Sequence, residues 1–312
     1  MDWSKLAQLT VDGTTLGCMY ALIALGYSMV YGILKLLNFA HGDVFMIGAF
    51  IGLFVYTALG GPLTPSIPIV LLLTAMFVAA AVGCGFLGVA IERFGYRPLR
   101  NSARIAPLIS ALGLSFLIQN SALLVFGASI RSYNTFEFDN GRFFTLGIHT
   151  NLVNVSLMRL IVIASAAVLM VGLMAYIRYT AVGKASRAVA FDREAAEMMG
   201  IDVDRVIATI FFVGSALAGI AGVMFGLIFQ NVFHYMGFIA GLKGFTAAVV
   251  GGIGSIPGAM LGGLFIGLVE SYAVGYLPQG STFQDLWVFF ILIAMMLLRP
   301  TGFLGKADIR RA

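Results

Sequence analysis

Long apolar segments alternate with short polar ones along almost the whole chain. About 20 apolar residues are needed for a helix to cross the roughly 30 Å hydrocarbon layer of a bilayer. Segments near or above that length are predicted as membrane helices at approximately residues 9–33, 44–60, 66–91, 106–127, 157–177, 206–229, 238–254, 257–276 and 284–299. We therefore expect an all-α fold, a polytopic transmembrane helical bundle of about eight spans, within a range of seven to nine.

Two of these segments, 44–60 and 238–254, are singled out as short. A half-helix that enters and leaves the membrane on one face is tolerated only where protein or a water-filled cavity surrounds it. We expect one or two short or re-entrant helices of this kind. Residues 1–312 are expected to form a single transmembrane domain.

Lys and Arg residues gather in three connecting segments. Four lie in the linker 92–104, five in the loop 178–205 and four in the tail from Arg299. Because cytoplasmic loops carry an excess of Lys and Arg, all three segments are predicted to be cytoplasmic, and the cation-poor loop 128–156 is predicted to lie outside. The side of the amino terminus stays open. Three complete spans before the first linker would place it outside, and one re-entrant piece would place it inside.

The composition narrows the class of protein. Hydrophobic residues make up 60% of the chain and charged residues 11%, so lipid, not water, is the solvent for most of it. The net charge of +5 does not indicate nucleic-acid binding, because the excess cations lie in loops at membrane boundaries and not on a continuous face. Cys18 and Cys84 fall inside apolar segments and are expected to be buried thiols.

The loop 178–205 carries five cations and five anions. Its centre is predicted as one short amphipathic helix, because Phe191, Ala195 and Met198 fall at positions i, i+4 and i+7 with charged residues on the other side. Gly200 supplies the left-handed residue that ends such a helix. A solvated surface loop between two spans is the simpler interpretation.

A short motif in this loop favours a docking role instead. Arg193 is followed by Glu194, Ala195 and Ala196, and after three more residues by Gly200. This string resembles the EAA loop of ABC importer permeases, which contacts the ATPase subunit. The resemblance implies that these five residues couple the chain to ATP hydrolysis.

A few polar residues lie in strongly apolar surroundings. Asn38, His41, Asp43 and Glu270 are costly there unless they face a cavity or one another. Asn38 and Asp43 can alternatively cap helix ends. All four are candidates for a translocation path that meets a zwitterionic solute, and Glu270 is the best candidate for a buried polar network. Lys243 is expected to snorkel to a membrane interface.

Several segments together are similar to the LivH-type permease of the branched-chain amino acid ABC importers. They cover nearly the whole chain in order, at residues 20–43, 97–120, 186–202, 243–263 and 297–305. The resemblance implies a multi-pass permease of the cell inner membrane with a periplasmic loop at 128–156. It also implies a second, LivM-like permease, two cytoplasmic ATP-binding subunits and a periplasmic amino-acid-binding protein as partners.

The resemblance implies import of branched-chain or other hydrophobic amino acids by alternating access. No GxxxxGK[ST] phosphate-binding loop occurs in the sequence, so ATP hydrolysis is assigned to partner subunits, and no cofactor or metal is expected. Urea and short-chain amide permeases share these motifs and remain alternatives. An ion-coupled transporter, with Glu270 and Asp43 as proton carriers, is a third. An intramembrane enzyme is disfavoured because His41, His149 and His234 lie in separate segments.

Overall fold

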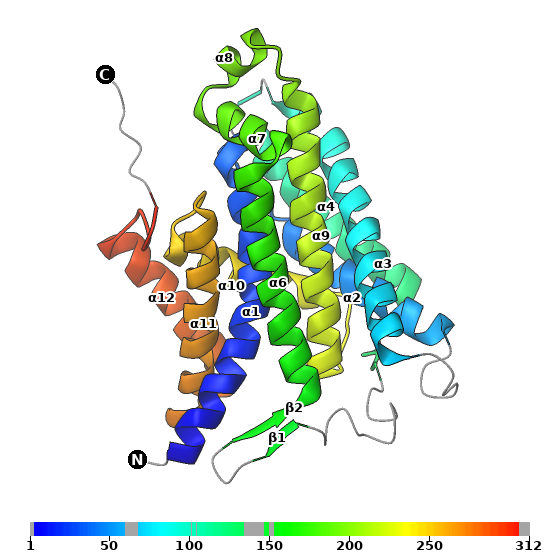
Figure 1. Ribbon diagram of the computed structural model, residues 1–312, viewed down its shortest axis with the longest axis vertical. Helices are drawn as coiled ribbons and strands as arrows, with labels where there is room; N and C mark the ends of the chain where they lie inside the picture. Colours follow the sequence, from blue (N-terminus) through cyan, green and yellow to red (C-terminus); the bar gives the residue numbers. More distant parts are fainter. Residues whose placement is uncertain are drawn as a thin grey trace.

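The computed structural model is a bundle of long helices with a small β-hairpin at one end (Figure 1). It describes residues 3–59, 68–100, 102–103, 105–133, 147–149 and 153–305. The helices are α1 (Trp3–Leu34), α2 (His41–Ala58), α3 (Ile69–Ala90), the π-helix η2 (Ile91–Tyr96), the 3₁₀-helix η3 (Arg97–Leu99), α4 (Ile105–Phe126), α6 (Leu157–Tyr179), α7 (Ala181–Phe191), α8 (Arg193–Met198), α9 (Val203–Phe229), α10 (Met236–Gly251), α11 (Ile256–Tyr276) and α12 (Gln284–Leu298). Strands β1 (Gly147–His149) and β2 (Asn154–Ser156) pair antiparallel.

The predicted spans correspond to these helices. Within the described ranges, seven helical segments are long and apolar enough to cross a membrane, whereas α10 and α12 are shorter. The all-α bundle is confirmed, and the chain is a multi-pass membrane protein. The segment expected at 44–60 is an 18-residue helix that reaches spanning length, so α12, with 15 residues, is the short helix that the sequence did not indicate.

Helix α1 forms the centre of the bundle. Its residues from Cys18 to Val30 are all buried, and it packs along the length of α11. The two backbones approach closely because glycines meet: a methyl group at Gly17 would lie 2.8 Å from the Cα of Leu264, and one at Gly267 would overlap Gly17. Small residues allow such contacts where lipid gives helices no hydrophobic reason to associate.

The two ends of the bundle differ. Helices α7 and α8 lie at one end, which we call the α8 end, and the carboxyl-terminal residues of the described chain lie toward it (Figure 1). The β1–β2 hairpin and the amino terminus lie at the opposite end, the hairpin end (Figure 1). Because α1 starts at the hairpin end and α9 starts at the α8 end, the amino terminus and the loop 178–205 lie on opposite sides of the bundle.

Helix α2 begins inside the bundle and not at its surface. After α1 ends, Lys35 adopts a left-handed backbone with φ 54°, and the chain turns back along α1. His41, the first residue of α2, lies so close to Gly26 that a methyl group there would overlap its ring. Gly26 is about 12 Å from the end of α1, given the rise per helical residue. Helix α2 then runs toward the hairpin end (Figure 1).

Helix α10 begins at the same depth. Helix α9 also ends at a left-handed residue, Gln230 with φ 59°, and the chain again returns into the bundle. The first turns of α2 and α10 meet at glycines, since a methyl group at Gly42 would lie 2.7 Å from the Cα of Gly241 and would overlap the carbonyl of Gly237. Both helices therefore begin inside the bundle, but neither leaves on the face where the chain entered: α2 continues to the hairpin end, and the residues after α10 lie beside Gly32 near the α8 end of α1, so neither of these two helices is re-entrant.

Candidate functional site

Three polar side chains gather where α2 begins, and we call them the break cluster: Asn38, His41 and Asp43. Each is only 1% exposed. They come from the segment that returns into the bundle and from the first turn of α2, so the break in the helix places them at membrane depth. This juxtaposition agrees with the sequence-based grouping of the three residues.

The break cluster contacts neighbouring helices instead of capping helix ends. Residue Ala40 precedes α2 without a side-chain cap, which contradicts the capping interpretation. One carboxylate oxygen of Asp43 accepts a hydrogen bond of 2.9 Å from the amide of Gln119 on α4, and Gln119 also lies 3.1 Å from the hydroxyl of Ser115. The side-chain oxygen of Asn38 accepts from the hydroxyl of Tyr96 at 3.3 Å.

The break cluster is only partly satisfied. His41 contacts Tyr27 edge-to-face, with ring centroids 4.8 Å apart. Its Nε2 atom, the Nδ2 atom of Asn38 and the Oδ2 atom of Asp43 are buried and have no hydrogen-bond partner within the described residues. Asp43 also forms no ion pair in that part of the chain. Buried polar atoms without partners are costly, and they are retained where they serve a function or meet another group.

A second polar cluster, the Lys243 network, joins four helices. Lys243 on α10 lies 2.7 Å from Glu270 on α11, and the other oxygen of Glu270 accepts a hydrogen bond of 2.9 Å from Tyr20 on α1. Lys243 is also 2.7 Å from Asp285 in the first turn of α12, an ion pair whose angle does not meet hydrogen-bond geometry. The side chains of Lys243 and Glu270 are both 5% exposed.

The expectation for Lys243 was wrong, and that for Glu270 is confirmed. Lys243 does not reach an interface, because its position on α10 faces Glu270 inside the bundle and the ion pair offsets the loss of hydration. Glu270 lies in a buried polar network as expected. It shares no described contact with the break cluster, so the four candidates for the translocation path occupy two separate places.

The loop 178–205 forms two helices and not one. Helix α7 ends at Phe191, and Asp192 begins α8 by accepting a hydrogen bond of 3.0 Å from the backbone of Ala195. The Asp192 cap interrupts the expected single helix. Gly200 has φ 83°, so its predicted left-handed conformation is confirmed.

Helix α8 projects from the bundle (Figure 1). Its single buried residue is Ala196, and Arg193 pairs with Glu197 across one turn at 3.2 Å. Large apolar side chains just before α8 and at its last residue face outward: Phe191 is 90% exposed and Met198 is 82% exposed. A short helix with exposed apolar and charged side chains is suited to contact another protein.

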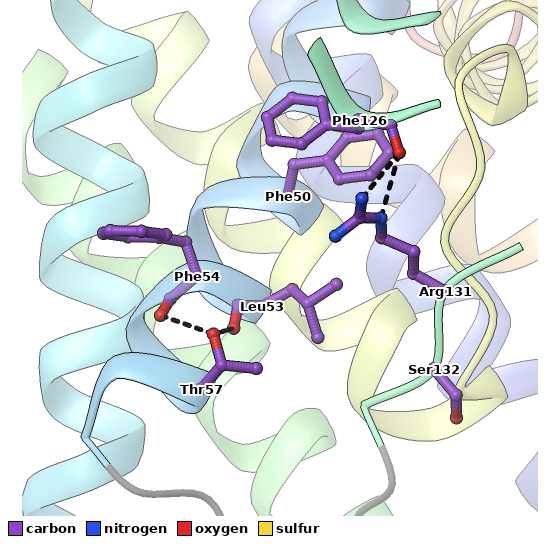
Figure 2. A pocket seen from close by; sticks show the side chains of 7 residues that line it. All are labelled: Phe50, Leu53, Phe54, Thr57, Phe126, Arg131 and Ser132. Carbon is purple, nitrogen blue, oxygen red and sulfur yellow. Dashed lines mark hydrogen bonds between the residues drawn. The ribbon is translucent and has the colours of Figure 1, made fainter. Parts of the chain in front are cut away.

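An open pocket of about 330 Å³ lies near the hairpin end of α2 (Figure 2). The rings of Phe50 and Phe126 stack along one side of it, with centroids 4.1 Å apart. Figure 2 shows the guanidinium of Arg131 turned toward the backbone of Phe126, whose carbonyl accepts two hydrogen bonds of 2.7 and 3.1 Å. Since those donors are engaged, we assign no ligand to this pocket.

Four residues of these clusters were not among the candidates predicted from the sequence. Gln119 was detectable as an amide in the middle of the apolar segment 106–127, and Asp285 as an acid at the start of the last one. Tyr20 and Tyr96 carried no signal, because tyrosine is common in membrane helices and only the fold brings their hydroxyls to Glu270 and Asn38.

Comparison with known proteins gives a consistent result. Residues 9–298 match the family model described as the branched-chain amino acid transport system permease component. The chain is 41% identical over 305 residues to the high-affinity branched-chain amino acid transport system permease protein LivH of Salmonella typhimurium, with 97% of both chains covered. It is 40% identical to the permease protein BraD of Pseudomonas aeruginosa, again covering 97% of each. A probable LivH of Methanocaldococcus jannaschii is 27% identical, over 92% of this chain and 89% of that one.

Proposed function

The chain belongs to the family of branched-chain amino acid transport permease components, and on this premise we propose that it is the permease subunit of an ABC importer for branched-chain amino acids. The observation that carries this proposal is the 41% identity to LivH over 97% of both chains. The related proteins are transport permeases and not enzymes, so ATP hydrolysis is assigned to partner subunits. We place the chain in the inner membrane as one permease domain, residues 1–312.

The α8 end is proposed to face the cytoplasm. The cationic segments 92–104, 178–205 and the tail from Arg299 support this orientation, because Lys and Arg are enriched in cytoplasmic loops. The amino terminus would then lie on the periplasmic side, as would the described parts of the loop 128–156. Residues 134–146, 150–152 and 306–312 lie outside the described residues.

Helix α8 is proposed as the element that docks on a cytoplasmic ATPase subunit. The proposed contact residues are Arg193, Glu194, Ala195 and Ala196, with Gly200 ending the motif. Exposure of the charged side chains and burial of Ala196 against the bundle support this role, because one face is held while the other is free to bind. Displacement of α8 by closure of the ATPase pair would drive alternating access.

The remaining partners follow from the family. We propose a second, LivM-like permease, so that two permeases and two ATPases form the membrane complex, and a periplasmic amino-acid-binding protein that delivers the solute. The names of the related proteins favour branched-chain amino acids over urea or amides as that solute. The break cluster is proposed to serve the translocation path, and Glu270 to hold Lys243 in place at a separate position in the bundle.

Variants of the α8 motif test this proposal. In Gly200→Val, a β-branched residue must adopt φ 83°, which is strained even though no atom lies within 4 Å of the added Cβ. We expect Gly200→Val and Glu194→Lys to lose co-purification of the ATPase subunits and uptake of labelled leucine into proteoliposomes. Gly172→Val on α6 is the control, because its added Cβ also meets open space but its backbone is helical.

Two results would contradict the proposed function, each in a different part. Normal ATPase binding and leucine uptake in both α8 variants would contradict the proposed coupling role. Leucine uptake by the purified chain without any ATPase subunit would contradict the assignment as an ABC permease and would favour an ion-coupled transporter.

A further inference from the structure

The π-helix η2 lies at the junction of several segments. It continues α3 with wider turns, so that the backbone N–H of Arg97 bonds to the carbonyl of Glu92 five residues earlier. The carbonyl of Gly95 also accepts a hydrogen bond of 2.9 Å from Ser110 on α4. Single π-turns inside helices are uncommon and frequently occur at functional sites. Its contacts extend in two directions, toward the α8 end and toward the membrane centre.

Toward the α8 end, η2 is linked to the first turn of α9 by a set of ion pairs, of which the Arg100–Glu92 pair is buried and the two pairs with Asp204 are partly exposed, since the Asp204 side chain is 39% exposed. Arg100 pairs with Glu92 of η2 and with Asp204 of α9, and the side chains of Arg100 and Glu92 are only 7% and 2% exposed. Arg97 pairs with Asp204 as well. Breaking the buried Arg100–Glu92 pair would leave an uncompensated charge, so these two residues are expected to move together, and the partly exposed pairs with Asp204 join them to α9.

The first turn of α9 is in turn adjacent to α8. Asp202 begins α9 by accepting a hydrogen bond of 3.1 Å from the backbone of Arg205. The backbone of Ile201 bonds at 3.0 Å to the carbonyl of Ala196, the buried residue of α8. Only a few residues of chain therefore separate the buried residue of α8 from Asp204.

Toward the membrane centre, η2 contacts the segment that leads into α2. The hydroxyl of Tyr96 donates to the carbonyl of Leu37 at 3.0 Å and lies 3.3 Å from the side-chain oxygen of Asn38. Tyr96 is 1% exposed, and its ring packs against Phe211 of α9 at a centroid distance of 5.4 Å. One side chain of η2 thus reaches the break cluster.

We propose that η2 is the relay between α8 and the break cluster, with Arg100 and Tyr96 as its positioning residues. The relay runs from α8 through Asp204, Arg100 and Glu92 to Tyr96, and from there to Asn38. It rests on the proposed function, since it requires that an ATPase displaces α8. Its two halves have different chemistry. The buried Arg100–Glu92 pair, with the pairs of Arg97 and Arg100 to Asp204, holds the cytoplasmic half together, whereas the hydrogen bonds of Tyr96 contribute little net free energy and are easily remade.

A rigid half followed by a replaceable hydrogen bond is suited to switching between two states. Movement of α9 and η2 as one unit would shift the Tyr96 hydroxyl along the segment 35–40, where Leu37 and Asn38 both offer oxygen acceptors. The start of α2 would follow, because Asn38 lies three residues before His41 and its carbonyl accepts a hydrogen bond of 3.1 Å from the His41 backbone. A physical relay of this kind requires an element with two arrangements, not only proximity.

The test measures leucine transported per ATP hydrolysed by the full complex in proteoliposomes. Tyr96→Phe removes the hydroxyl alone and keeps the ring contact with Phe211. We expect ATPase subunits to co-purify and hydrolyse ATP as in the wild type, while the transport ratio falls on the order of 2- to 30-fold. Glu92→Gln is expected to lower the ratio in the same way. Asp12→Asn is the matched control, because it breaks the Asp12–Arg159 ion pair away from the relay.

The double variant Glu92→Gln/Tyr96→Phe distinguishes a relay from two independent supports. Residues of one relay should give a combined loss smaller than the product of the two single losses, whereas independent supports should multiply. Multiplying losses, or ratios unchanged in Tyr96→Phe and Glu92→Gln with the ATPase bound, would overturn the relay. Failure of the wild-type chain to bind an ATPase would overturn the proposed function instead, so the two failures are separable.

Discussion

The Lys243 network and the break cluster lie at membrane depth in the same bundle, yet they satisfy their polar groups differently. In the Lys243 network each charge faces an opposite charge, and Tyr20 binds the second oxygen of Glu270. In the break cluster three buried atoms lack a partner among the described residues, and Asp43 has no cation beside it. One cluster joins helices α1, α10, α11 and α12, and the other lies at a break in the backbone.

This difference indicates that the Lys243 network has a structural role and that the break cluster takes part in a conformational change. A network in which every charge has an opposite charge beside it is stable only in one arrangement, because any shift separates charges in a medium that solvates them poorly. A partly paired cluster is less stable as it stands, but it can exchange partners with a solute or with a shifted neighbour at little cost. We therefore interpret the Lys243 network as a fixed joint and the break cluster as part of the transport cycle.

Among these variants, Lys243→Met is expected to lower the thermal stability of the complex most. It leaves Glu270 and Asp285 facing each other without a cation, and removing one partner of a buried ion pair costs about 3–5 kcal/mol. We expect a large fall in the thermal stability of the purified complex. Lys243→Met/Glu270→Met should recover much of the loss, because apolar replacement of both partners is often neutral. A single variant as stable as the wild type would remove the distinction between the two clusters.

A smaller loss of stability is expected from Gly42→Ala, which changes the contact between α2 and α10. The added methyl group would lie 2.7 Å from the Cα of Gly241 and would overlap the carbonyl of Gly237, so the two helix starts must separate. Overpacking of this kind costs about 1–3 kcal/mol. Thermal unfolding measures the loss, and leucine uptake should fall with it.

Gly113→Ala on α4 is the control for Gly42→Ala. No described atom lies within 4 Å of its added Cβ, so this variant should be neutral or slightly stabilising, because alanine favours the helix over glycine where the methyl group meets open space. Equal stability of the Gly42 and Gly113 variants would show that the starts of α2 and α10 tolerate separation.

Asp43→Asn should change stability little and transport substantially. Its amide oxygen still accepts the hydrogen bond from Gln119, and the variant removes a charge that no cation balances among the described contacts, so the change in unfolding free energy should stay within about 1 kcal/mol. Leucine uptake should nevertheless fall if this carboxylate serves the transport cycle. Leu53→Met, a volume-conserving change in the same helix, is the control. Unchanged uptake would assign Asp43 a structural role like that of Glu270.

The sequence predicts much of this architecture because its main signals are local. Length and hydropathy locate the membrane helices within a few residues, and Gly200 ends the α8 segment with the expected left-handed backbone. The predictions that were wrong depend on contacts between residues far apart in the sequence. From the sequence alone Lys243 is predicted to be interfacial, but the fold places Glu270 opposite it. Asn38 is considered as a helix cap, but its side chain contacts Tyr96, which lies 58 residues later in the chain. Pairings between distant segments leave no periodic pattern to detect.

The smallest loss of stability is expected from Asp285→Asn. This variant tests whether the Lys243 network depends equally on Glu270 and Asp285. The side chain of Asp285 is 43% exposed, and exposed ion pairs contribute about 0.2–1 kcal/mol, less than a buried pair. Lys243 would keep its buried partner Glu270, so thermal stability should fall only slightly, whereas Glu270→Gln should cost several times more. If Asp285→Asn were the more harmful of the two, the start of α12 would be an essential part of the joint. The fixed part of the bundle would then extend to α12, a helix whose one buried residue is Val288.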